Sequence, residues 1–229
     1  MKVIDLTHTI SETMPVYPGT EQPRLTPANS YEKDGFKETL LSMYSHTGTH
    51  VDPPAHLFAG RTTLDAFPVS QFVGRAVVID CRHLKEGEAI TMREIAPRRA
   101  DAEKADYLLF NLGWDARWGT PEYYGDYPCI DDEVIDFILA TNKKGIGFDV
   151  IGVDPIPDAD LPRHLIVMAP EYRRKISRRF FLFQHIENRM IRGAAVTAIF
   201  FITVKPVFHQ DVADDAGAPV GGIGKIAVR

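Results

Sequence analysis

The chain of 229 residues is poor in cysteine and has no long apolar run. Its two cysteines, Cys81 and Cys129, form neither a CxxC pair nor the framework of a disulfide-rich domain. The longest apolar run, residues 194–204, has about half the length that a membrane-spanning helix needs. The sequence does not open with a basic segment followed by an apolar one, so we expect no secretory signal. These absences predict a soluble, cytoplasmic protein with reduced thiols.

An excess of positive charge is missing as well. The 26 lysines and arginines are outnumbered by 31 aspartates and glutamates, which gives a net charge of −5. Such a chain has no overall attraction for nucleic acid or anionic membranes, and we expect neither as a partner. An apolar share of 45% and a charged share of 25% are typical of a globular protein. Because no repeat or linker divides the sequence, we expect a single domain over residues 1–229.

Short runs of β-branched, aromatic and aliphatic residues predict more strands than helices. We expect strands at residues 3–6, 39–44, 76–81, 107–112, 146–153 and 195–204. A capping-box pattern at residues 91–94 predicts a helix start, and Pro97 should end or kink that helix. A second helix should begin after Asp131 and end before Gly145, and residues 113–128 should form a long loop. The pattern predicts a mixed α/β fold with a β core and flanking helices.

Three of the eight histidines fall within residues 46–56. His46, His50, Asp52 and His56 are separated by even numbers of residues, and even positions of an extended chain point to one face. His50 and Asp52 would lie about 7 Å apart at Cα, close enough to share an ion. His46 can join them only if the chain bends at Gly48, whereas Pro53 and Pro54 would turn His56 back toward the site.

Imidazole and carboxylate ligands without thiolates suit zinc, manganese or iron. Two histidines and one aspartate leave positions open for water, which is the arrangement of a catalytic metal. Three alternatives remain at this point. The histidines could form an ordinary polar turn, or His50, Asp52 and a distant histidine could be the triad of a non-haem iron oxygenase. The chain could also be a metal-binding protein without turnover.

The sequence resembles the cyclase family of metal-dependent hydrolases, which includes bacterial kynurenine formamidase and isatin hydrolase. The family motif H-x-G-T-H-x-D-x-P-x-H is matched in full by residues 46–56. Further similar segments span the chain: residues 4–8, 16–19, 74–80, 113–114, 147–149, 186–188 and 217–220. The resemblance implies a swivelling β/β/α domain, commonly dimeric, that cleaves an amide, lactam or ester bond of a small aromatic or cyclic substrate.

The resemblance also implies roles for individual residues. His46, His50 and Asp52 would hold a first divalent metal, zinc or manganese, and His56 would be the catalytic acid and base. His164 and Glu187 would complete a site for a second ion, with Asp52 bridging the two.

Aromatic residues could form the substrate pocket. Tyr17, Phe58, Trp114 and Trp118 could line it, although each is also compatible with ordinary packing. Kynurenine formamidases carry tryptophan where Tyr17 stands, so we expect a different pocket here. The basic segment 173–179 is expected to be a solvated helix face.

Overall fold

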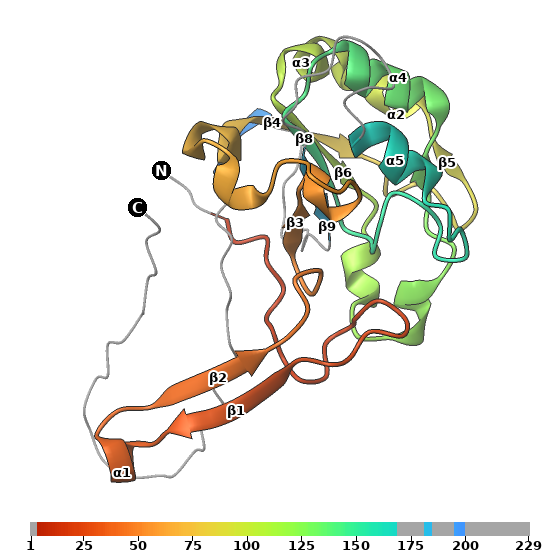
Figure 1. Cartoon of the computed structure of the whole chain (residues 1–229). Helices are drawn as coiled ribbons and strands as arrows, with labels where there is room; N and C mark the ends of the chain where they lie inside the picture. The colour runs from red at the N-terminus through yellow and green to blue at the C-terminus, as the bar shows by residue number, and fades with distance from the viewer. Residues whose placement is uncertain (1–3, 169–180, 185–194, 200–229) are drawn as a thin grey trace.

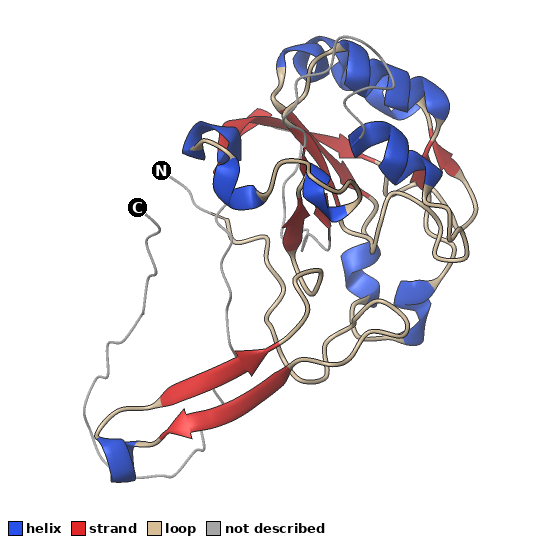
Figure 2. Cartoon of the chain, viewed as in Figure 1, coloured by secondary structure: helices blue, strands red, loops and turns tan. Residues whose placement is uncertain are grey.

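The computed structural model describes residues 4–168, 181–184 and 195–199. Its centre is a mixed six-stranded sheet with the order β10–β4–β6–β8–β9–β3, flanked by helices (Figures 1 and 2). Strands β4, β6, β8 and β9 run parallel to one another. The outer strand β10 is antiparallel to β4, and the outer strand β3 is antiparallel to β9. The strands are β3 (His50–Asp52), β4 (Val73–Asp80), β6 (Tyr107–Asn111), β8 (Gly145–Phe148), β9 (Phe181–Gln184) and β10 (Ala195–Ile199). The predicted mixed α/β class, with a β core and flanking helices, is confirmed.

Strand β6 is buried along its whole length because both of its faces are covered. Leu108 and Phe110 point into the main core, whereas Tyr107 and Leu109 point into a smaller core on the other face. A strand covered on both faces has a continuous run of apolar residues, and this run is why β6 could be predicted from the sequence. The main core is closed by helices that gather on one face of the sheet (Figure 2): α2 (Met92–Ile95), α3 (Arg99–Lys104), α4 (Asp132–Ala140) and α5 (Pro162–Met168).

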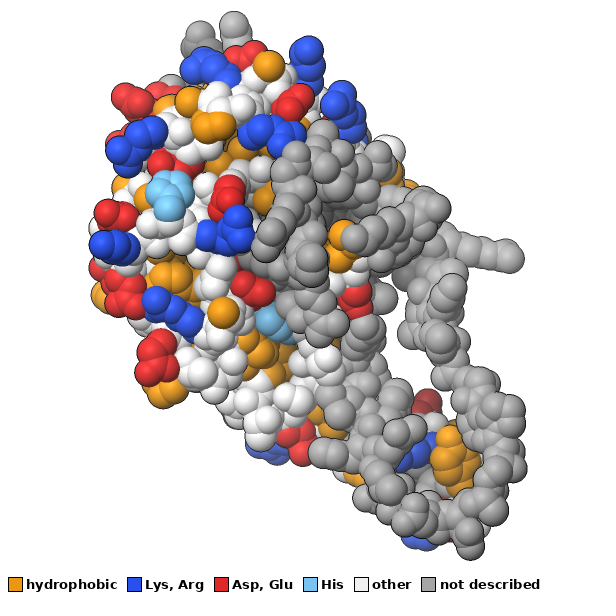
Figure 3. All heavy atoms as spheres, turned by 180° about the vertical axis from the view of Figure 1, so that it is seen from behind, with side chains coloured by type: hydrophobic (Ala, Val, Ile, Leu, Met, Phe, Trp, Pro, Cys, Tyr) orange, Lys and Arg blue, Asp and Glu red, His pale blue; other side chains and the backbone are white. Residues whose placement is uncertain are grey.

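A two-stranded arm projects from this body (Figure 1). It consists of β1 (Arg24–Asn29) and β2 (Glu38–Ser42), which pair antiparallel, with the short helix α1 (Tyr31–Asp34) at its tip. A second small sheet joins β5 (Ala89–Ile90) to β7 (Cys129–Ile130). Charged side chains of both signs are interspersed over the body in Figure 3. None of the described helices is long and apolar enough to cross a membrane.

The predicted helix starts are confirmed, and one predicted helix end is wrong. Thr91 and Glu94 form the capping box of α2, which stops at Ile95, and the chain continues through a 3₁₀ turn that contains Pro97. The Asp131 side chain accepts the backbone N–H of Val134 and caps α4. Gly145 does not end this helix, since it is the first residue of β8. Asn142 takes the left-handed position instead, with φ of 52°, because asparagine tolerates this conformation better than most residues.

Most predicted strands lie where the sequence placed them, at β2, β4, β6, β8 and β10. The segment 146–153 was predicted too long, since β8 ends at Phe148 and the chain then bends. Residues 4–6 form no strand, and residues 1–3 and 200–204 lie outside the described part. The predicted loop 113–128 contains two 3₁₀ helices, at Trp114–Arg117 and Pro121–Tyr124.

Candidate metal centre

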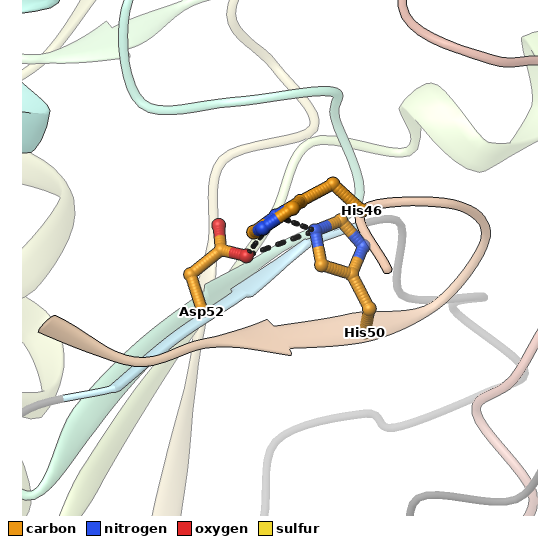
Figure 4. A group of neighbouring side chains, drawn as sticks. All are labelled: His46, His50 and Asp52. Carbon is orange, nitrogen blue, oxygen red and sulfur yellow. Dashed lines mark hydrogen bonds and ion pairs between the residues drawn. The ribbon is translucent and has the colours of Figure 1, made fainter. Parts of the chain in front are cut away.

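The three predicted ligands of the first metal come together from one short segment (Figure 4). Asp52 and His50 belong to β3, and His46 lies in the loop before it. The Oδ1 atom of Asp52 is 2.5 Å from Nδ1 of His46 and 3.1 Å from Nε2 of His50. The two imidazole nitrogens are 3.2 Å apart. His50 pairs with Gln184, the last residue of β9, so the cluster lies at the edge where the parallel strands end.

The bend that joins His46 to the other two ligands occurs at Gly48, as predicted. Gly48 has φ of 67°, a conformation that glycine adopts without strain. A Cβ atom at this position would also lie 2.8 Å from Cε of Met14, so a side chain would displace its neighbour. The carbonyl oxygen of Gly48 lies 2.8 Å from Nδ1 of His50. Because a carbonyl only accepts, Nδ1 donates, so in the neutral form of the ring Nε2 is the atom with a lone pair toward the site.

Asp52 is the electrostatic centre of the cluster and is 1% exposed. Burial by itself would raise the pKa of Asp52, but hydrogen bonds from His46 and His50 outweigh this effect and hold the pKa far below its usual range. Burial would likewise lower the pKa of His50, yet Asp52 outweighs it and raises the pKa. A buried carboxylate of this kind keeps its charge at neutral pH.

His56 lies against the cluster without belonging to it. The 3₁₀ helix Pro54–His56 turns the chain back, and the ring of His56 packs on the ring of His46 with centroids 3.6 Å apart. The pKa of His56 is lowered, mainly because the ring is partly removed from water and secondly because a charge on His46 would repel a charge on His56. Part of the side chain still reaches the surface. A neutral imidazole at this position can accept a proton.

The structure describes one of the two further residues predicted to bind the second metal. His164 is buried in α5, and a positive charge on its ring would contribute to lowering the pKa of His56. Glu187 and its basic neighbour segment 173–179 lie outside the described residues. The sequence did not single out Asp154, whose Oδ2 atom lies 2.6 Å from Nδ1 of His164. The sequence could not predict this contact, because the two residues are ten positions apart and meet only when the chain between them folds back.

The predicted aromatic residues occupy different environments. Tyr17 is exposed and Phe58 is half-buried, whereas Trp114 is buried in the main core and donates its Nε1–H to the carbonyl of Tyr123. Trp118 stacks on His8, with ring centroids 3.8 Å apart. The backbone N–H of His8 donates to Oγ1 of Thr49, within the metal-binding loop.

The donor set fits a divalent metal ion. One nitrogen from each of His46 and His50 and one oxygen from Asp52 lie within 4.8 Å of one another. Among the residues that the structure describes, this is the one group of three such side chains arranged in this way. Imidazole nitrogens and a charged carboxylate are the ligands of zinc and manganese, and three protein ligands leave room for water.

Comparison with known proteins decides between the alternatives that the motif left open. The model of the family described as "Putative cyclase" matches residues 4–155, more than half of the chain. The chain belongs to the cyclase family of metal-dependent hydrolases. This membership confirms the resemblance seen in the sequence, and it favours hydrolysis over the oxygenase alternative.

Two relatives of this cyclase-family hydrolase are kynurenine formamidases. The protein from Salinibacter ruber is 28% identical over 166 residues, which cover 72% of this chain and 76% of the relative. The protein from Geobacillus thermodenitrificans is 30% identical over 164 residues, covering 70% and 74%. Isatin hydrolase A from Labrenzia aggregata matches with a TM-score of 0.71 at 23% identity, over 89% of this chain and 88% of that one. This last similarity shows a shared fold.

Proposed function

We propose that this cyclase-family hydrolase uses a divalent metal to cleave an amide, lactam or ester bond in a small aromatic or cyclic molecule. The observation that supports the proposal most directly is the convergence of His46, His50 and Asp52, with His56 packed beside them. The relatives named kynurenine formamidase and the fold neighbour named isatin hydrolase indicate carbonyl substrates with a ring.

In this mechanism His46, His50 and Asp52 would hold the metal. A bound divalent ion lowers the pKa of water toward neutrality and polarises a carbonyl oxygen. His56 accepts a proton from the attacking water and returns it to the leaving nitrogen or oxygen. Its lowered pKa keeps the ring neutral, and therefore basic, at pH 7.

The proposal includes a second ion, which His164, Glu187 and Asp52 would hold. Zinc and manganese both suit these ligands, and cellular availability selects between such metals as often as affinity does. Tyr17, Phe58 and Trp114 are the proposed apolar lining of the substrate site, with Trp114 contributing from within the core. We further propose that residues 1–229 form one domain and act in the cytoplasm.

We also propose that the protein is a homodimer. Its projecting arm exposes large apolar side chains, since Phe36 is 51% and Leu40 63% exposed. An isolated two-stranded hairpin is marginally stable in water, and burial of these side chains against a second copy would stabilise it.

Metal content tests the proposed function. Protein purified without a histidine tag or added metal would be measured by elemental analysis, alongside His50→Ala, His164→Ala and Glu187→Ala. We expect about two ions per chain in the unmodified protein, loss in His50→Ala, and about one fewer in each of the other two variants. Full metal content in His50→Ala would overturn the site. One ion that only His50→Ala removes would leave a mononuclear hydrolase.

A further inference from the structure

Asp154 is a buried carboxylate whose two oxygens both face α5. The side chain is 2% exposed and lies in the bend between β8 and this helix. Its Oδ1 atom accepts the backbone N–H of Arg163, and Oδ2 accepts that of His164, both at 2.9 Å. The same Oδ2 atom is 2.6 Å from Nδ1 of the His164 ring. The carboxylate therefore holds both the backbone and the side chain of His164.

This contact fixes the tautomer of His164. An ionised carboxylate can only accept hydrogen bonds, so Nδ1 of His164 must carry a proton, and in the neutral ring Nε2 is the atom with a lone pair. The two backbone N–H groups that donate to its oxygens favour the charged form of the carboxylate. The arrangement repeats that of His50, whose Nδ1 faces the carbonyl of Gly48.

The surroundings of His164 leave the ring little freedom to rotate. A Cβ atom on Gly152 would lie 3.2 Å from Cε1 of His164, so the backbone packs closely against the ring. The hydroxyl of Tyr127 donates to the carbonyl of Asp154 at 2.6 Å and anchors the backbone that bears the carboxylate. The backbone of Asp154 is therefore fixed by a hydrogen bond, and the ring of His164 packs between the Asp154 carboxylate and Gly152.

We propose that Asp154 is the positioning residue of the second half of the metal centre. By accepting the Nδ1–H of His164, it keeps the proton on that nitrogen and leaves Nε2 as the ligand atom, a role that rests on the proposed function. Partners of this kind orient metal-binding histidines, and their loss costs about 10- to 100-fold in metal affinity or activity.

The test compares Asp154→Ala with the unmodified protein and with Asp131→Ala. Asp131 is the matched control, because it also caps a helix, α4, by accepting the backbone N–H of Val134. Two-bond ¹H–¹⁵N correlations of the histidine rings in metal-free protein report the tautomer of His164. Zinc titration against a competing chelator then reports affinity, and the shift of the His164 ring on zinc addition reports its ligation.

We expect His164 to be a single Nδ1–H tautomer in the unmodified protein and in Asp131→Ala, and a mixture in Asp154→Ala. Asp154→Ala should retain the ion at His46, His50 and Asp52 but bind zinc at His164 about 10- to 100-fold more weakly. Asp154→Asn keeps one acceptor oxygen and should fall between the two. This variant provides the test if Asp154→Ala does not fold.

Two results would overturn the inference. One is an unchanged tautomer and unchanged zinc affinity without the carboxylate. The other is a His164 ring in the unmodified protein that does not respond to zinc while the first site fills. In both cases zinc would still bind at His50, so the proposed function would stand. Failure of the proposed function would instead appear as zinc binding that His50→Ala leaves intact.

Discussion

His56 shares a loop with the metal ligands, yet its proposed task is to move a proton. We predict that His56→Ala lowers kcat on a formylated aromatic amine by at least about 100-fold, because proton transfer by a positioned side chain contributes about 10²- to 10⁴-fold. Metal content should stay the same. The control is His83→Ala, an exposed histidine that contacts Glu94 of α2 and should be silent in both measurements. A parallel loss of metal would make His56 a ligand.

Gly48 links backbone conformation to the site. We predict that Gly48→Ala weakens zinc binding and lowers stability by about 1–3 kcal/mol, because it combines strain at positive φ with a clash against Met14. Gly60→Ala is the matched control, since Gly60 has φ of 73° and nothing within 4 Å of its Cβ position. Chelator competition and thermal unfolding would measure both effects. Equal behaviour of the two variants would show that the Met14 contact has no influence.

Residues near in sequence could be predicted, and residues brought together by folding could not. His46, His50 and Asp52 occupy one short segment, so their spacing and one glycine were enough to predict the cluster. Asp154 reaches His164 only after the chain has bent back, and its sequence context resembles that of any aspartate in a turn. The tautomer of each histidine depends on such distant acceptors.

At the scale of elements, the end of α4 offers a direct test. Asn142 adopts φ of 52° just beyond this helix. We predict that Asn142→Gly leaves stability unchanged or raises it slightly, whereas Asn142→Ala lowers it by about 1–2 kcal/mol, because a Cβ atom disfavours the left-handed region. Urea unfolding would measure both. Equal stability of the two variants would contradict this account of the helix end.

The elements that the sequence revealed are those with strong local patterns. Strands β4 and β6 have long apolar runs, and the capping residues of α2 and α4 mark their starts. Strands β3, β5 and β7 have only two or three residues and leave no periodic signal. The sequence analysis placed the end of α4 too late because glycine is the residue most typical of a helix C-terminus, and Gly145 is the first glycine after Asp131. The chain adopts the left-handed conformation that ends the helix earlier, at Asn142.

For the whole molecule, the arm makes dimerisation testable. We predict that Leu40→Glu shifts the protein from dimer to monomer in light scattering after size exclusion, because it places a charge where apolar contact is proposed. Val69→Glu, at an exposed apolar residue of the body, is the control and should leave the mass unchanged. A monomeric unmodified protein, or a Leu40→Glu variant that remains dimeric, would contradict the proposed role of the arm.

The position of β3 has a consequence for how the protein is made. In the part of the chain that the structure describes, the ligand strand His50–Asp52 joins the sheet through its pairing with β9, residues 181–184, which is synthesised much later. Pairings between such distant segments form slowly and cannot begin before the second partner has left the ribosome. A nascent chain that has emerged only as far as α5 therefore carries its histidines on an unanchored strand. Maturation of the enzyme, including the uptake of metal, is in this view a late event that follows synthesis of β9.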